Sequence, residues 1–383
     1  MRPLERIKVI EMEGTPQIPP TNYCGMLLSD FGADVMVIER LSKRDSEIPH
    51  SMSKNLFNRG KRSMRIDLKT KEGLEILQGM IKDFDVFMES FRPGVMEALS
   101  LGPKDALKLN PRLIYARLTG WGQTGPYAHR AGHDINFIAL SGALSLFRRK
   151  GERPLPPCNI VGDFAGGSMF CVFGILLALI ERSKSGKGQV IDVAMVDGTA
   201  NLLTQFYASL ANHLMTLDIG TNLIDGGAPF YQVYETSDGK FVAVGAIERK
   251  FYGQLIEGIG LDPSSLPHQY DMSRWPEMKD HFTKAFKTKT RDEWVAFFEG
   301  KDACVFPVLE LNEVEKHPHN QERELIINMD GIPQPAPAPK LSRTPGKAVK
   351  SEDSKGSCTR DILNQLGYAE EKIKSLFEKG IVE

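Results

Sequence analysis

The sequence of 383 residues has few cysteines and no excess of charge of either sign. Its five cysteines are an odd number and none stands in a CxxC pair, which argues against a disulfide framework or a zinc site and favours a reducing compartment. Lys and Arg number 48 and Asp and Glu 49, a formal net charge of −1. Nucleic-acid binding needs a net or clustered positive surface, so we expect no nucleic-acid partner.

The chain also lacks a clear targeting signal and a clear membrane span. Its first 14 residues contain no apolar core and reach acidic side chains early, unlike a signal peptide, and its last residues are not of the SKL type. The longest apolar run, 165–180, is shorter than the ~20 residues of a membrane span, and Glu181 and Arg182 follow it at once. We therefore expect a buried helix there, no membrane span and an intracellular soluble protein.

Strand-like and helix-like stretches alternate along the first 200 residues. We expect strands at 8–12, 35–38, 65–68, 86–88, 112–118 and 190–195, with helices at 22–31 and 71–82. Alternation of this kind predicts βαβ units, and hence an α/β fold with a large, doubly wound, Rossmann-like parallel sheet. No GxGxxG follows the first strand, so the phosphate loop of a dinucleotide site is missing.

A second, smaller α+β domain is expected from about residue 225. A hairpin around 237–239 precedes helical patterns at 250–258, 275–286 and 291–298. The proline-rich stretch 332–345 predicts an extended linker, and two helices are expected at 361–366 and 373–377. The expected division is a large domain at 1–200, a linker at 201–224, a small domain at 225–315, and a return linker with helices packing on the large domain at 316–383.

His133 stands where a glycine-rich loop gives way to a helical pattern that begins near Asp134. A lone histidine is more often structural than catalytic. An imidazole nevertheless titrates near neutral pH, so it is able to act as a general base. The pattern alone leaves both interpretations open.

Asp163 comes just before the apolar run at 165–180. Its carboxylate fits the role of a helix N-cap. The same helix start offers unpaired N–H groups and a positive dipole end, which stabilise a developing oxyanion. The small residues at 165–167 would also let a ligand approach the backbone. A cap and a catalytic carboxylate both fit this pattern.

Other polar side chains are weaker candidates when each is taken alone. Glu248 closes the apolar stretch 242–247 and is most simply a solvated strand end. Arg40, Arg92 and the basic cluster 59–62, which contains Lys61, are candidates for binding an anion. A cluster of charges usually forms a solvated face, so none of them indicates a site by itself.

Several short motifs occur together and in order between about residues 5 and 345. Through them the chain resembles the family III CoA-transferase superfamily, and within it the α-methylacyl-CoA racemase branch. Each motif is short, but their joint order is specific. The motifs are DFGAD (30–34), NRGKR (58–62), FRPGV (91–95), PRLIYAR (111–117), GWGQTGP (120–126), GHDIN (132–136), DFAGG (163–167), GKGQV (186–190), DGGAP (225–229), GAIE (245–248) and DAC (302–304).

The resemblance implies an interlocked homodimer in which each active site is shared between the large domain of one subunit and the small domain of the other. It implies that His133 and Asp163 are the acid/base pair flanking the α-carbon of the substrate. It also implies that Glu248, contributed by the second copy of the chain, hydrogen-bonds and orients His133.

The resemblance further implies how substrate is bound. Asn159 is expected to contact the thioester, and Arg40, Lys61 and Arg92 are expected to bind the CoA moiety. Coenzyme A is then part of the substrate, and no separate cofactor or metal is expected. Similar proteins of eukaryotes work in peroxisomes or mitochondria, so we expect one of these compartments in a eukaryote and the cytoplasm otherwise.

The implied activity is inversion of the α-carbon of 2-methyl-branched acyl-CoA thioesters by 1,1-proton transfer through an enolate. Backbone N–H groups near Asp163 are expected to hold the enolate oxygen. Two other functions stay open: a CoA-transferase that forms an acyl anhydride on Asp163, and a catalytically silent CoA-binding dimer. Transferases of this superfamily tend to have an aromatic residue at the position of His133, so the histidine favours the racemase.

Overall fold

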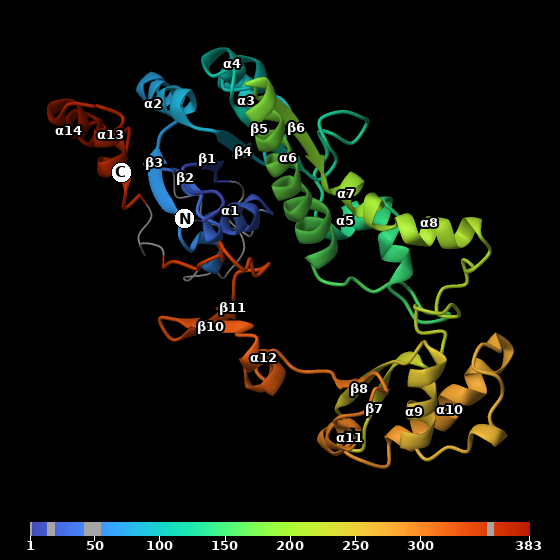
Figure 1. Ribbon diagram of the computed structural model, residues 1–383. Coiled ribbons are helices and arrows are strands. Elements are labelled where there is room, and N and C mark those ends of the chain that lie inside the picture. The colour runs from blue at the N-terminus through green and yellow to red at the C-terminus, as the bar shows by residue number, and fades with distance from the viewer. Residues whose placement is uncertain (1, 14–19, 42–54, 351–355) are drawn as a thin grey trace. The chain divides into compact units, whose positions relative to one another are not determined.

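The computed structural model describes residues 2–13, 20–41, 55–350 and 356–383, which form two compact units (Figure 1). One unit consists of Met1–Ser141, Cys158–Leu202 and Glu324–Glu383. The other consists of Gly142–Pro157 and Leu203–Arg323. Each unit has its own hydrophobic core.

The first unit is built on a six-stranded sheet in the order β3-β2-β1-β4-β5-β6. Every neighbouring pair is parallel, which confirms the expected doubly wound α/β fold. The strand order reverses between β1 and β4, and folds of this kind bind ligands beyond the carboxyl ends of the strands at such a switch point. The strands are β1 (Lys8–Met12), β2 (Asp34–Arg40), β3 (Arg62–Ile66), β4 (Val86–Glu89), β5 (Ile114–Thr119) and β6 (Gln189–Ala194).

Successive residues of these strands enter different cores, because both faces of a parallel sheet are covered by helices. Val9 faces the core under α1 (Pro20–Asp30) and α6 (Phe170–Ser185), whereas Ile10 faces the core on the other side. That second core is covered by α2 (Lys71–Asp83), α4 (Pro103–Leu109), α13 (Thr359–Gln365) and α14 (Glu370–Glu378).

Two expectations for this unit need correction. The third strand is Arg62–Ile66 rather than 65–68. It ends at Ile66 because Asp67 and Thr70 already belong to the turn that caps α2. The proline-rich stretch is not wholly an extended linker: β11 (Ile332–Pro335) pairs antiparallel with β10 (Ile326–Met329). A two-stranded hairpin consists only of edge strands, where proline is tolerated. The remaining elements of the unit are α3 (Val95–Ala98), α5 (Asp134–Leu140), the π-helical segment η3 (Ile160–Met169), α7 (Met195–Leu202) and the 3₁₀ turn η1 (Leu56–Asn58).

The second unit contains a three-stranded antiparallel sheet in the order β7-β8-β9. The expected hairpin is confirmed as β7 (Tyr231–Glu235) and β8 (Phe241–Gly245), joined by β9 (Val305–Pro307). The expected helices are confirmed as α9 (Arg249–Gly258), α10 (Trp275–Phe286) and α11 (Arg291–Phe298). The other elements are α8 (Thr204–Ala211), α12 (Pro318–Glu322) and the 3₁₀ turns at Ala143–Leu146, Pro263–Ser265, Met272–Arg274 and Val314–Lys316.

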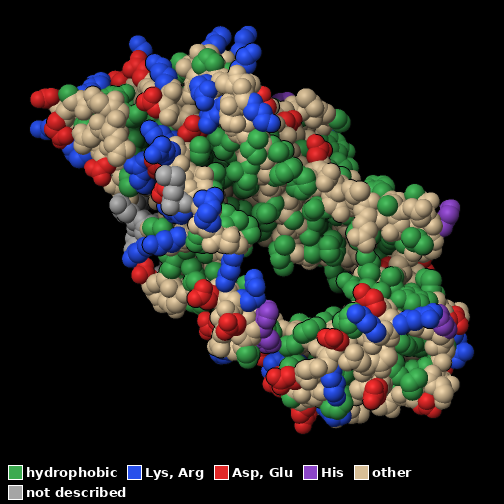
Figure 2. All heavy atoms as spheres, in the orientation of Figure 1, with side chains coloured by type: hydrophobic (Ala, Val, Ile, Leu, Met, Phe, Trp, Pro, Cys, Tyr) green, Lys and Arg blue, Asp and Glu red, His purple; other side chains and the backbone are tan. Residues whose placement is uncertain are grey.

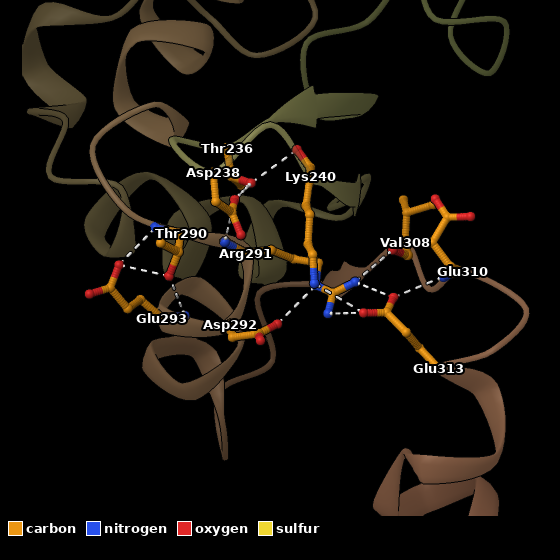
Figure 3. Close-up of polar contacts among 10 residues, drawn as sticks. All are labelled: Thr236, Asp238, Lys240, Thr290, Arg291, Asp292, Glu293, Val308, Glu310 and Glu313. Atoms are coloured by element: carbon orange, nitrogen blue, oxygen red, sulfur yellow. Dashed lines mark hydrogen bonds and ion pairs between the residues drawn. The ribbon is translucent and has the colours of Figure 1, made fainter.

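A buried arginine ties the parts of this second unit together (Figure 3). The guanidinium of Arg291 donates two hydrogen bonds to the carboxylate of Glu313, at 2.6 and 2.9 Å, and one to the carbonyl oxygen of Val308 at 3.2 Å. The backbone N–H of Arg291 donates to Asp238 in the β7–β8 turn at 3.2 Å. The hairpin, α11 and the segment after β9 therefore share one anchor.

Candidate functional site

His133 is the N-cap residue of α5, one position before the helix begins at Asp134. Its backbone N–H donates to the side-chain oxygen of Asn136 at 3.0 Å, and its carbonyl oxygen accepts the N–H of Asn136 at 2.8 Å. The backbone around His133 is thus fixed at both polar groups, while its imidazole is exposed. An exposed ring on a fixed backbone is suited to meet a ligand.

Asp163 does not cap a helix, contrary to one of the two interpretations of its pattern. The helical segment begins at Ile160 with η3, so Asp163 lies within the first turn. The glycines of this segment permit close packing: a Cβ on Gly166 would lie 2.4 Å from Oγ1 of Thr199 in α7. Single π-helical turns are frequent at functional sites.

The cap of η3 comes from Asp134. Its Oδ2 atom accepts the backbone N–H groups of both Gly162 and Asp163, each at 2.7 Å. A Cβ on Gly162 would lie 2.7 Å from the same oxygen, which explains a glycine there. Asp134 therefore joins the start of α5, where His133 lies, directly to the backbone of Asp163. Its sequence position suggested only a cap for its own helix.

This contact narrows the choice of backbone donors for an enolate oxygen, which stays a prediction. The N–H groups of Gly162 and Asp163 at the helix start both donate already to Asp134. Because a hydrogen atom bonded to a buried carboxylate is not available to a second strong acceptor, a substrate oxygen would have to find its donor elsewhere.

The carboxyl group of Asp163 has a strongly perturbed acidity. Burial raises its pKa to about 6, and the charge of Asp134 acts in the same direction. The Nδ2 of Asn159, which donates to Oδ2 of Asp163 at 3.2 Å, lowers the pKa, as does the charge of His133. A carboxyl group with a pKa near neutrality exchanges protons readily at physiological pH. The structure thus joins Asn159 to Asp163 by a hydrogen bond and places His133 close enough for its charge to act on Asp163.

Two arginines proposed to bind CoA lie at the carboxyl ends of β2, the neighbour of β1, and of β4, on either side of the switch point. Arg40 ends β2, and its guanidinium lies over the ring of Phe91, 5.3 Å from the centroid. Arg92 lies in the exposed turn that follows β4. Both side chains are exposed, as charged groups that meet a phosphate must be before the ligand arrives.

Lys61 has a different setting from the two arginines. Its ammonium donates to both carboxylate oxygens of Glu11, at 2.9 and 2.7 Å, and to the carbonyl oxygen of Asn22 at 2.9 Å. Both side chains of the ion pair are buried. A Cβ on Gly25 would lie 1.8 Å from the Glu11 carboxylate, so this pair fills a space that a glycine leaves. Lys61 would have to leave Glu11 to reach a phosphate.

Glu248 lies in the second unit. It is the N-cap residue of α9, its carbonyl oxygen accepts the N–H groups of Phe251 and Tyr252, and its side chain is exposed. Its charge acts together with burial to raise the pKa of Cys304. The expected hydrogen bond between Glu248 of a second copy of the chain and His133 stays a prediction.

Two further charged residues, Glu89 and Arg117, escaped sequence reasoning. Glu89 ends β4 beside the FRPGV motif, and Arg117 ends the PRLIYAR motif and pairs in register with Glu89 on the neighbouring strand β5. An acidic and a basic residue within or next to two recognised motifs were the available signal. Among the described residues, no group of three or more His, Cys, Asp or Glu is placed to hold a metal ion.

Comparison with known proteins gives consistent relatives along nearly the whole chain. The model of the family "CoA-transferase family III" matches residues 4–353. The chain is 47% identical to the alpha-methylacyl-CoA racemase of Mus musculus and 46% identical to that of Homo sapiens, over 99% of this chain and 97% of each relative. The crystal structure of a CAIB/BAIF family protein from Brucella suis matches with a TM-score of 0.81 at 25% identity, covering 95% of this chain and 99% of that one.

Proposed function

Because the chain belongs to CoA-transferase family III, we propose that it is an isomerase, an α-methylacyl-CoA racemase. It inverts the configuration of the α-carbon of 2-methyl-branched acyl-CoA thioesters. The α-proton is removed from one face of the carbon, and a proton is added to the opposite face. The near-full-length similarity to two racemases supports this activity. The structural observation that carries it is the link between His133 and Asp163 through Asp134, which follows His133 and accepts the backbone N–H of Asp163 at 2.7 Å. The pKa of the Asp163 carboxyl group, which burial raises to about 6, supports it.

Racemisation needs two proton carriers, one on each face of the reacting carbon. The thioester acidifies the α-proton because the carbanion spreads onto the carbonyl oxygen as an enolate. Asp163 as the carboxylate, or His133 as the neutral imidazole, removes the proton, and the other group in its protonated form returns a proton to the opposite face. Positioned acid and base groups typically contribute ~10²–10⁴-fold each. No cofactor is required, since coenzyme A belongs to the substrate.

We propose that the CoA moiety lies over the carboxyl ends of the strands next to the switch point. Arg40 and Arg92 would meet its phosphates there, with Asn159 next to the thioester. Lys61 belongs to this proposal only if its ion pair with Glu11 opens. Most of the binding energy would then come from a handle remote from the reacting carbon, and such energy can be used to orient the α-carbon.

We also propose that two copies of the chain share each site, with Glu248 of one copy orienting His133 of the other. The apolar run of the sequence supports a partner: α6 is not wholly buried, and it exposes Phe173, Leu177 and Ile180, spaced along one side of the helix. Figure 2 shows hydrophobic side chains gathered over α6. Apolar patches of this extent commonly mark protein interfaces.

The same helix bears on the membrane question. Together, η3 and α6 form the segment Ile160–Ser185. Among the described residues, this segment alone is long and apolar enough to cross a membrane, and 33% of its most apolar 18-residue stretch is buried. A second copy of the chain accounts for the exposed apolar side chains without a bilayer. An intracellular location is part of the proposal, and it is supported by the five cysteines, none of which forms a disulfide bond in the structure.

A CoA-transferase is the second candidate, because Asp163 is a carboxylate next to a polar contact, Asn159. A transferase needs one carboxylate nucleophile and no opposing base, so the presence of His133 beside Asp163 favours racemisation. The two functions separate cleanly in one experiment. Proton NMR of (2R)-methylacyl-CoA in D₂O follows the α-proton, and an added carboxylic acid reveals any transfer of CoA.

We expect loss of the α-proton signal together with loss of optical purity, and no new CoA ester. His133→Gln and Asp163→Asn should each abolish inversion, and a variant that retains proton exchange from one face would identify the remaining base. Accumulation of a CoA ester of the added acid would establish the transferase. Full inversion by His133→Gln would overturn the assignment of this residue.

A further inference from the structure

We propose that Arg117 is a positioning residue that holds the turn Phe91–Gly94, and through Arg92 of that turn sets the affinity for the CoA moiety. The inference rests on the proposed function, because it concerns how the substrate is bound. Arg117 lies on β5, next to β4 in the sheet, and contacts neither His133 nor Asp163 in any hydrogen bond or ion pair of the described residues.

The first step of the argument is that one guanidinium holds two carboxylates. Nε of Arg117 donates to Oε1 of Glu89 at 2.8 Å. Its Nη1 and Nη2 donate to the two oxygens of Glu97, at 2.7 and 3.3 Å. Arg117 and Glu89 are buried, and Glu97 is partly exposed at the edge of the network. The planar guanidinium has donors on two sides, a geometry that an ammonium does not offer.

The second step is that the two carboxylates hold the two ends of one turn. The other oxygen of Glu89 accepts the backbone N–H of Phe91 at 2.6 Å. Oε2 of Glu97 accepts the backbone N–H of Gly94 at 3.0 Å. Gly94 has φ of 89°, a left-handed conformation that favours glycine. Phe91 and Gly94 are therefore both anchored, directly or indirectly, to Arg117, and Arg92 lies between them.

The third step is the position of this turn. It follows β4 at the carboxyl end of the sheet, where the switch point between β1 and β4 places a ligand in folds of this kind. The ring of Phe91 carries the guanidinium of Arg40, so the turn sets the position of both arginines proposed to meet the CoA phosphates. A displacement of the turn would move both charges.

The fourth step is that this buried network of charges is a poor source of folding stability. Burial raises the pKa of Glu89 to about 7, against the opposing effects of the Phe91 N–H and Arg117. Apolar residues of similar volume often replace buried ion pairs without loss of stability. A buried charge network at a ligand-binding edge is better explained by the precise placement of the groups that it holds.

The test compares Arg117→Lys with a matched control, Arg182→Lys. Arg182 is also buried and forms an ion pair with Asp85 at 2.8 Å. Asp85 precedes β4, so this ion pair lies at the end of the strand opposite to Glu89. Both substitutions keep the positive charge and replace the planar guanidinium, which has donors on two sides, with an ammonium group. The measurements are KM and kcat for a 2-methylacyl-CoA, and the dissociation constant of free coenzyme A by calorimetry, with the full-length chain.

We expect Arg117→Lys to raise KM and the dissociation constant of coenzyme A about tenfold while kcat changes less than threefold. Arg182→Lys should leave all three near the wild-type values, even where it lowers the melting temperature equally. In Arg92→Ala, adding Arg117→Lys should weaken coenzyme A binding further by clearly less than the tenfold expected in the wild type, because Arg117 acts in part through Arg92 and in part, by way of Phe91, through Arg40. If Arg117→Lys does not fold, Glu97→Gln takes its place, since it weakens the anchor at Gly94 from the exposed side.

Unchanged coenzyme A binding in a folded Arg117→Lys or Glu97→Gln variant would overturn the inference. An equal loss in Arg182→Lys would also overturn it, since the effect would then follow from stability alone. Because coenzyme A binding is measured directly, weakened binding in Arg117→Lys supports the inference even if the wild-type chain fails to racemise any substrate, in which case only the proposed function falls.

Discussion

One side-chain oxygen of Asp134 accepts the backbone N–H of Asp163 at 2.7 Å. Asp134 is also the residue that follows His133, so a single carboxylate links the two proposed proton carriers through the backbone on both sides. Movement of α5 relative to η3 would break this hydrogen bond and the one from Gly162. The separation of the two proposed proton carriers is therefore fixed by a third residue, which is not itself proposed to carry a proton.

Removing that link should damage both stability and turnover. Asp134→Ala leaves the N–H groups of Gly162 and Asp163 without their acceptor, and each unpaired buried donor costs about 1–3 kcal/mol. We expect urea denaturation to show a loss of about 2–4 kcal/mol and kcat to fall at least tenfold, because small misplacements of catalytic groups are costly. Asp134→Asn retains an acceptor oxygen of the same shape and serves as the control, with a smaller loss of stability. Equal kcat in Asp134→Ala and the wild type would contradict the positioning role.

The pH dependence of the reaction should show the ionisation of Asp163. Burial raises the pKa of this carboxyl group to about 6. Below that pH the group is protonated and cannot accept the α-proton, so for the enantiomer whose α-proton Asp163 removes we expect kcat/KM to fall about tenfold per pH unit as the pH drops below about 6. The charge of Asp134 contributes to the raised pKa. Asp134→Asn should consequently move the acidic limb of the profile to lower pH, and a shift in the opposite direction would contradict this electrostatic account.

Asp163 should also lower the stability of the fold at neutral pH. A carboxyl group whose pKa is raised in the folded state binds its proton more tightly there than in the unfolded chain, so stability falls as the pH rises from about 4 to about 6. Above pH 6 the carboxylate is charged and partly buried, so it continues to lower the free energy of unfolding. We expect Asp163→Asn to raise the free energy of unfolding at pH 8 by about 1–2 kcal/mol, after allowance for partial exposure, while abolishing inversion. The gain should shrink at pH 4, and a gain that is constant with pH would point to another cause.

Local sequence patterns were sufficient for most of the elements. Trp275–Phe286 and Arg291–Phe298 form helices with the expected bounds, and Lys8–Met12 forms the first strand. These segments have a clear apolar period and a strong boundary, such as Thr290, which caps α11 through Glu293. The expected third strand was placed too far along the chain, because the strand ends at Ile66 and the backbone N–H of Asp67 donates instead to the carbonyl oxygen of Ile381, which is far away in the sequence.

The residues of the candidate site could be named from the sequence, but their connections could not. His133, Asp163 and Asn159 were identified by motif, and their roles stay predictions; the structure joins Asn159 to Asp163 by a hydrogen bond and places His133 where its charge acts on Asp163. The role of Asp134 was not visible, because its partners lie 28 and 29 positions away and a carboxylate at a helix start is ordinarily a local cap. Long-range hydrogen bonds of this kind leave no periodicity in the sequence.

The apolar side of α6 gives the last prediction, which concerns assembly. Phe173 is 58% exposed, on a helix whose opposite side packs into the core of the first unit. A charge placed there would lie in an apolar interface if two copies meet on this surface, and burying an unpaired charge is strongly unfavourable. We expect Phe173→Glu to convert a dimer into a monomer in sedimentation velocity runs. Leu341→Glu, at another exposed apolar side chain of the same unit, should leave the dimer intact.

The activity of that monomer tests the shared site. If Glu248 of one copy orients His133 of the other, the monomer loses inversion although its own His133 and Asp163 are unchanged. Mixing Phe173→Glu with the wild type should not restore its activity, because the interface is repulsive on one side. A folded Phe173→Glu monomer with full activity would show that one chain completes the site alone, and a variant that stays dimeric would place the interface elsewhere.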